Sequence, residues 1–175
     1  NPAVQLDFGG YAKGLALDRA LQILRAHQIR HALVNIGGNL IALGQHHGRP
    51  WHIGVQAPRG AGAIVELDLH DGEAIGTSGD YQRYFELAGR RYCHIIDPRT
   101  GYPATHTQSV TVLAPPGPHA GVLSDVASKP AFIAANPDWQ TQLANLGIKA
   151  GLRVDESGKM TMTEAMAARA QRVHP

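Results

Sequence analysis

The 175-residue sequence is short of cysteine, of aromatic residues and of long apolar runs, and each shortage excludes a class of protein. Cys93 is the only cysteine, so the chain cannot form an internal disulfide. No window reaches the roughly 18 consecutive apolar residues that a membrane-spanning helix needs. Basic residues are scattered, aromatic residues make up 6% and the formal net charge is only +2, so no nucleic-acid-binding surface is indicated. With one cysteine, the chain has no CxxC pair for a zinc site.

The opening NPAVQLDFGG lacks a starting methionine and the basic and apolar segments of an export signal. This pattern is typical of a mature or truncated piece of a longer chain. A length of 175 residues is that of one ordinary domain, which can bury roughly two thirds of its unfolded surface.

Apolar periodicity and turn residues predict one α+β domain with helices packed on a mainly antiparallel sheet. Residues 11–27 carry apolar side chains on one helical face, and residues 138–146 form a further helix that Gly147 ends. Between them Pro130 must lie near a helix start, with Ser128 as N-cap, or kink the helix. Strands are predicted over residues 31–36, 40–43, 51–56, 64–69, 73–77, 81–87, 91–96, 109–113, 150–154 and 160–163.

Three glycine-containing segments could line a ligand site. In DFGGYAKG (7–14), a Gly-Gly turn before a helix and the charge of Lys13 could hold a phosphate, although such turns are also common structural features. NIGGN (35–39) could open a cleft or simply permit a tight turn. TSGD (77–80) offers hydroxyl and carboxylate groups for a sugar or phosphate, or for an Asx-type turn.

Two further segments carry groups that could act on a substrate. In YCHIIDPRTGYP (92–103), strand alternation places His94 at a strand end beside Asp97, which suits a general base, although a histidine taken alone is more often structural. SDVASK (124–129) supplies a carboxylate and hydroxyl groups that could bind Mg²⁺ or serve as a helix N-cap.

Taken together, DFGGYAKGLALDRAL, LVNIGGN, PWHIGVQAPR, TSGDYQRYF and YCHIIDPRTGYP, in this order, closely resemble the ApbE family of FAD:protein FMN transferases. The resemblance covers residues 6–135. It implies an ApbE-like, T-fold-related domain, of which residues 1–175 are the C-terminal portion. Family members carry a further segment before Asp7 that includes part of the flavin pocket, so FAD binding without it is expected to be weak.

The resemblance also implies an activity. Family members use Mg²⁺ to cleave the pyrophosphate of FAD, attach FMN to a threonine hydroxyl of an acceptor flavoprotein and release AMP. Acceptors include subunits of Nqr- and Rnf-type redox pumps, and the family location is the periplasm or cell envelope, with membrane attachment only through a lipoprotein anchor. Two alternatives stay open: an FAD pyrophosphatase that yields free FMN and AMP, and a non-catalytic flavin-binding or assembly module.

Position by position, the resemblance makes His94 the base that deprotonates the acceptor threonine. The magnesium ligands that it implies are Gly10, through its carbonyl, Asp125 and Ser128. The implied FAD contacts are Asp7, Lys13, Ser78, Gly79, Ile95, Thr100 and Gly101.

Two positions depart from the family pattern. The family places Asp and Thr four residues apart as metal ligands, whereas here Lys129 follows Asp125 at that spacing, so an ammonium could weaken the metal or replace part of its charge. Shifting the alignment puts Gly121 on the Asp position and Asp125 on the Thr position, which leaves Asp125 the one acid at this site either way. Cys93 stands where many members have a second histidine.

Overall fold

Antiparallel strand pairing organises residues 2–173, the part of the chain that the computed structural model describes. The main sheet has six strands in the order β1-β2-β5-β10-β11-β12. Its strands are β1 (Ala32–Ile36), β2 (Asn39–Leu43), β5 (Ala74–Gly79), β10 (Thr107–Ala114), β11 (Ala150–Asp155) and β12 (Met160–Met162). The predicted α+β class with a mainly antiparallel sheet is therefore confirmed.

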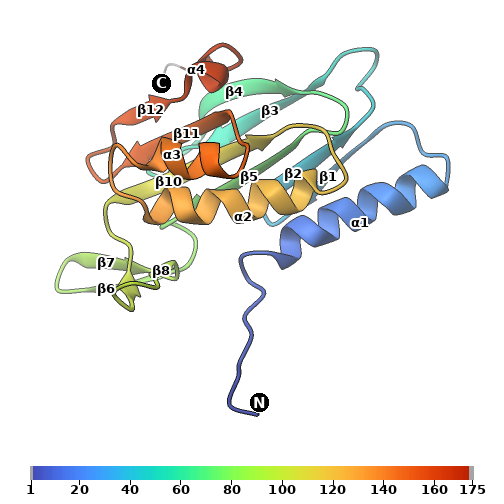
Figure 1. The fold of residues 1–175 in the computed structure, drawn as a ribbon. Coiled ribbons are helices and arrows are strands. Elements are labelled where there is room, and N and C mark those ends of the chain that lie inside the picture. The colour runs from blue at the N-terminus through green and yellow to red at the C-terminus, as the bar shows by residue number, and fades with distance from the viewer. Residues whose placement is uncertain (1, 174–175) are drawn as a thin grey trace.

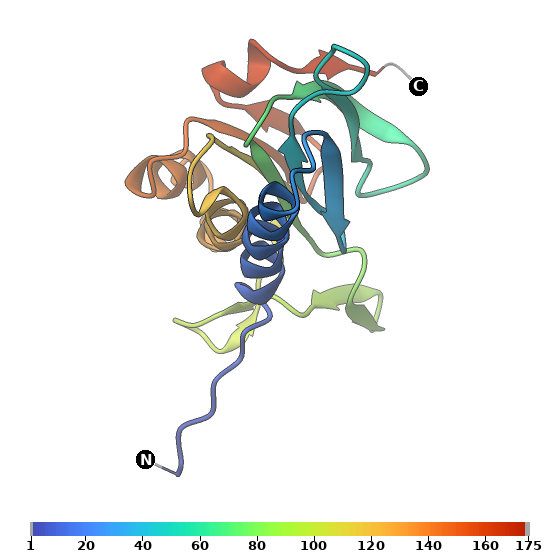
Figure 2. The ribbon, with the colours of Figure 1, turned by 90° about the vertical axis from the view of Figure 1, so that its right-hand side faces the viewer.

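Helices cover one face of this sheet (Figures 1 and 2). They are α1 (Ala12–Ala26), α2 (Ala120–Ile133) and α3 (Trp139–Asn145). Alternation along β10 points Val110 and Val112 at this layer, where they join a core with Ala127 and Phe132 of α2 and Trp139 of α3. The helices thus bury their apolar stripes on the central strands, which fixes where their ends lie.

A second, smaller sheet covers the opposite face. It pairs β3 (Trp51–Gln56) with β4 (Ala63–Leu69) and β4 with β13 (Gln171–Arg172), and α4 (Glu164–Ala167) lies beside it. Ile75, Leu113 and Leu152 of the main sheet pack there against Val65 and Leu67 of β4. A further apolar cluster lies between α1 and the β1–β2 end of the main sheet. The described chain therefore has three layers, with apolar residues packed on both faces of the main sheet.

Two hairpins and the N-terminal segment extend beyond these layers at one end of the molecule (Figure 1). The hairpins pair β6 (Tyr84–Leu87) with β7 (Arg90–Cys93) and β8 (Ile96–Asp97) with β9 (Tyr102–Pro103). Residues 4–8 form no helix or strand, and the side chains of Val4, Leu6 and Phe8 are exposed. The N-terminal segment leads into the start of α1, and the hairpins project from the same side of the molecule (Figures 1 and 2).

Two predictions about element boundaries are wrong. Pro130 lies in the last turn and a half of α2, which begins at Ala120, so Ser128 is inside the helix and is not an N-cap. The apolar contacts of Ala127, Ala131 and Phe132 outweigh the loss of one backbone hydrogen bond at the proline.

The predicted strand over 91–96 is also interrupted. β7 ends at Cys93, and His94 lies in a bend where its backbone N–H donates to the carbonyl of Arg83 at 3.1 Å. Tyr92, His94 and Ile96 therefore do not share the face of one strand. β8, β9, α4 and β13 were not predicted, because elements of two to four residues carry too little periodicity to detect.

Candidate functional site

The start of α1 and the middle of α2 meet at a buried carboxylate. Asp125 is fully buried, and its Oδ2 accepts a hydrogen bond from the backbone N–H of Gly14 at 3.0 Å. Gly14 stands in the first turn of α1, where backbone N–H groups have no partner within the helix. The carboxylate therefore satisfies one of these groups and lies at the positive end of the helix dipole.

The two helices hold each other through a pattern that both sequences contain, GLALD (14–18) and GVLSD (121–125). Asp18 of α1 accepts hydrogen bonds from the N–H groups of Gly121 at 2.7 Å and Val122 at 2.9 Å, so each helix caps the N-terminus of the other. Glycine is required at the crossing, because a Cβ on Gly14 would lie 2.4 Å from the carbonyl oxygen of Gly121. This contact fixes Asp125 against the first turn of α1.

Lys129, one turn after Asp125 on α2, places its ammonium on this carboxylate. Nζ forms an ion pair with Oδ1 of Asp125 and donates to the Asp125 carbonyl at 2.7 Å. Burial alone would raise the pKa of Asp125, but the hydrogen bond and charge of Lys129 and the Gly14 N–H hold it below its usual value. Burial lowers the pKa of Lys129, and the charge of Asp125 opposes that shift.

Lys13 brings a second cation to the same end of α1. Its Nζ donates to Oδ1 of Asn39 at 3.4 Å, and its stem lies over Gly37. Asn39 is 1% exposed, and among the described residues its Nδ2 has no hydrogen-bond partner. A buried amide donor without a partner is costly. This one faces the interior, because a Cβ placed on Gly76 would be 3.2 Å from it, so only Oδ1 of Asn39 lies on the Lys13 side.

Ser78 and Ser128 form a contact of their own between β5 and α2. Their hydroxyl oxygens are 2.7 Å apart, and the Ser128 hydroxyl donates to the carbonyl of Asp125 at 2.8 Å. Ser128 is fully buried, so its hydroxyl is used in helix and sheet contacts. The aromatic ring of Tyr81 covers Gly79.

His94 lies between β7 and β8 of the two hairpins and is exposed. Its Nδ1 is 3.1 Å from the carbonyl oxygen of Arg83, which can only accept, so Nδ1 carries the proton and Nε2 is free to accept one. The expected partner, Asp97, is instead bound by Arg99 through contacts of 2.8–3.2 Å. The side-chain and backbone hydrogen bonds of Arg99 lower the pKa of Asp97 to about 2.

The other predicted residues are spread over four places. Ile95 is buried in the core, and Thr100 and Gly101 are exposed in the β8–β9 turn. Asp7 is exposed before α1, where its Oδ1 accepts from the N–H of Gly9 at 2.6 Å. Gly10 lies beside Lys129, because a Cβ placed on it would be 3.4 Å from Cε of that lysine.

The structure thus brings Gly10, Lys13 and Asp125 together, along with Lys129, while the hairpin residues form a second group. No hydrogen bond or ion pair among the described residues joins the two groups. Asn39 and Asp18 were not predicted as site residues. The repeated Gly-x-x-x-Asp pattern could have indicated Asp18, but nothing in NIGGN shows that its last residue is buried.

These residues do not fit the expected magnesium ion. Both oxygens of Asp125 have partners, Lys129 occupies one of them, and the Ser128 hydroxyl is engaged elsewhere. In the described part of the chain, no group of three or more His, Cys, Asp or Glu side chains could hold a metal ion. Magnesium keeps several waters and is usually held by one or two carboxylates, and here the one carboxylate at the site is already engaged by Lys129 and the Gly14 N–H.

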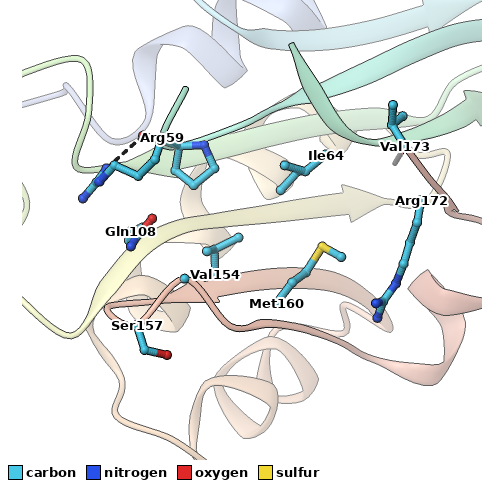
Figure 3. Close-up of a pocket in the computed structure, with 10 residues that line it drawn as sticks. Arg59, Ile64, Gln108, Val154, Ser157, Met160, Arg172 and Val173 are labelled. Carbon is cyan, nitrogen blue, oxygen red and sulfur yellow. Dashed lines mark hydrogen bonds between the residues drawn. The ribbon is translucent and has the colours of Figure 1, made fainter. Parts of the chain in front are cut away.

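A cavity of about 540 Å³ lies away from this site, between β4 and β13 on one side and β10, β11 and β12 on the other (Figure 3). Ile64, Val154 and Met160 line its apolar part, and Arg59 and Gln108 lie at one end. None of the predicted site residues lines it. Within residues 2–173, no helix has the length and apolar character needed to cross a membrane.

Comparison with known proteins gives relatives of one kind. A curated FAD:protein FMN transferase of Rhodobacter capsulatus is 44% identical over 173 residues, which are 99% of this chain and 32% of the relative. One from Treponema pallidum is 42% identical over 134 residues, 69% of this chain and 36% of the relative.

Solved structures agree with these relatives. The crystal structure of the ApbE protein of Thermotoga maritima matches with a TM-score of 0.86 at 39% identity, over 97% of this chain and 54% of that one. The apo form of the Pseudomonas stutzeri flavinyl transferase ApbE matches with a TM-score of 0.77 at 34% identity, over 94% of this chain and 51% of that one. The chain thus spans about half the length of these solved relatives and about a third of the curated ones. With the family's sequence model also matching residues 1–152, the chain belongs to the ApbE family.

Proposed function

We propose that the protein containing this chain transfers FMN from FAD to a threonine hydroxyl of an acceptor flavoprotein. In this reaction the threonine oxygen forms a bond to the phosphorus of the FMN moiety. The pyrophosphate bond to AMP breaks, and AMP leaves with the bridging oxygen. The hydroxyl proton passes to a base, so the products are a flavinylated acceptor, AMP and one proton.

The observation that carries this proposal is the Lys13 ammonium, which Asn39 holds beside the start of α1. A pyrophosphate offers negative charge to the Lys13 ammonium and an anion to the helix terminus. Phosphoryl transfer depends mainly on positioning and on charge stabilisation, and these groups supply both. The names of the relatives, FAD:protein FMN transferase, support the same reaction.

His94 is the proposed base for the acceptor hydroxyl. The Arg83 carbonyl sets its tautomer, so Nε2 can take the proton. Its exposed position at the hairpin end leaves access for a macromolecular acceptor. Thr100 and Gly101, in the neighbouring β8–β9 turn, would form part of the surface that the acceptor or the flavin contacts.

The resemblance implies Mg²⁺ held by Gly10, Asp125 and Ser128, but Lys129 holds the Asp125 carboxylate and the Ser128 hydroxyl is engaged with Ser78 and the Asp125 carbonyl, so this proposal assigns no step to the ion. The location implied by the family is a finer point of the proposal. The cell envelope is the proposed location. Fractionation of cells that express the tagged full-length protein tests it, and a purely cytosolic signal would contradict it.

The reaction is tested by intact-mass spectrometry of a threonine-bearing acceptor domain after incubation with the full-length protein and FAD. The assay is run with Mg²⁺ and again with EDTA. Addition of one FMN mass with release of AMP is expected. Free FMN with an unmodified acceptor would indicate an FAD pyrophosphatase, and intact FAD with bound flavin would indicate a binding module.

A further inference from the structure

Lys129 has the position and contacts of a built-in cation. It follows Asp125 by one helical turn, so both side chains lie on the same face of α2, opposite the start of α1. Its ammonium contacts two oxygens of Asp125, one carboxylate and one carbonyl. Its stem runs along Gly10, with Cε, Cδ and Cγ at 3.4, 3.8 and 3.9 Å from the position a Cβ would take there.

The buried carboxylate explains why a cation must be present. Asp125 is fully buried, and a buried carboxylate is stable only when paired with a positive charge and hydrogen-bonded. The Gly14 N–H supplies a hydrogen bond, and Lys129 supplies the only full positive charge in contact with Asp125 among the described residues. A divalent ion at the same carboxylate would stand beside this ammonium, and like charges at such distances repel.

The shifted alignment does not restore a metal site. It gives the acidic position to Gly121, which has no side chain and is pressed against the Gly14 carbonyl, so that a Cβ there would be 2.5 Å from that oxygen. Asp125 is the sole acid in either alignment. The residue that faces it one turn later is Lys129.

We propose that the Lys129 ammonium is the resident cation of this site, and that the protein stabilises the negative charge of its pyrophosphate substrate without a divalent ion at Asp125. The proposal rests on the proposed function for its substrate. Lys129 and Lys13 then both lie near the start of α1, with the Asp125 carboxylate holding Lys129 in place. Lys129 is 24% exposed at its side chain, so it can still reach a bound phosphate oxygen.

The test measures metal binding and transfer separately on the full-length protein. Mn²⁺ alone is titrated without FAD and followed by the electron paramagnetic resonance signal of the free ion. The wild type is expected to take up no Mn²⁺ at this site. Lys129→Thr, which restores the family spacing of Asp and Thr, is expected to bind Mn²⁺ at least about tenfold more tightly. Lys149→Thr, at an exposed lysine, is the matched control and should bind like the wild type.

FMN transfer is then measured in EDTA and in Mg²⁺. The wild type should change by less than about twofold between the two, whereas Lys129→Thr should lose about 100-fold in EDTA and recover in Mg²⁺. Mn²⁺ uptake by the wild type, or loss of wild-type transfer in EDTA with recovery in Mg²⁺, overturns the proposal, and neither result needs a variant to fold. If no variant transfers FMN under any condition, the proposed function fails, while the Mn²⁺ titration still decides the role of Lys129.

Discussion

At the α1–α2 crossing, Gly14→Ala has two opposite effects on stability, a higher helix propensity and a steric clash. Alanine favours a helix over glycine by about 1 kcal/mol, so propensity alone predicts a more stable protein. The new Cβ, however, would lie 2.4 Å from the Gly121 carbonyl oxygen and 2.6 Å from the Cα of Val122, whereas real Cβ atoms essentially never come within 3.0 Å of a neighbour. Both contacts are backbone atoms, so the helices themselves must separate.

The clash should outweigh the propensity. Overpacking of this kind costs about 1–3 kcal/mol, and separation also weakens the hydrogen bond from Gly14 to the charged Asp125, worth about 1.5–3 kcal/mol. After subtraction of the propensity gain, the free energy of unfolding should fall by about 1.5–5 kcal/mol. For a domain of this size that lowers Tm by about 3–20 °C.

Thermal unfolding of the full-length protein, followed by circular dichroism, measures this change. Gly117→Ala is the control, because a Cβ there meets nothing within 4 Å, and its Tm should stay near that of the wild type. A Gly14→Ala protein with an unchanged or higher Tm would refute the reasoning. It would mean that the helix contact adjusts freely and does not fix the site.

Three further predictions concern charge and proton transfer. His94→Ala should slow FMN transfer by about 10²–10⁴-fold with FAD affinity nearly unchanged, because only the base is removed. His27→Ala, at an exposed histidine, is the control, and near wild-type transfer by His94→Ala would show that His94 is not the base. Asp125→Ala leaves the Lys129 ammonium without its counter-charge, so the free energy of unfolding should fall by about 3 kcal/mol and FMN transfer should be lost. Urea unfolding and the mass assay measure the two effects, and a variant that is both stable and active contradicts the prediction. The pKa of Asp97 is about 2, below its unfolded value, so the stabilisation by Arg99 is present above about pH 4 and is lost as the pH falls through about 2. In Arg99→Ala, an NMR titration of the Asp97 carboxyl should give a pKa closer to 3.8, and an unchanged value would show that Arg99 does not cause the shift.

The order of helices and strands was predictable where periodicity was long enough. Apolar spacing gave α1, and alternation or β-branched runs gave the strands of the main sheet, because these patterns depend only on which face is buried. Pro130 was misplaced because the rule against proline in helices is local, whereas the packing of Phe132 and its neighbours on β10 depends on distant residues.

The candidate site was only partly predictable for the same reason. Lys13 and Asp125 could be identified from motifs, but their meeting depends on the crossing of α1 and α2, which are more than 90 residues apart in sequence. The sequence could not show whether Asp97 pairs with Arg99 or with His94, because both residues lie within three positions of Asp97. The missing hydrogen-bond partner of Asn39 is visible only once the sheet is assembled.

Because α1 and α2 cap each other, the exchange of three backbone amides reports on the separation of these two helices. The amide protons of Gly14, Gly121 and Val122 are bonded to carboxylates of the opposite helix and not to carbonyls of their own. Fraying of either helix alone cannot expose all three, whereas separation of the helices exposes them together. After correction for their intrinsic exchange rates, all three should therefore give one common opening free energy, and a ligand that bridges the start of α1 to α2 should slow all three by the same factor.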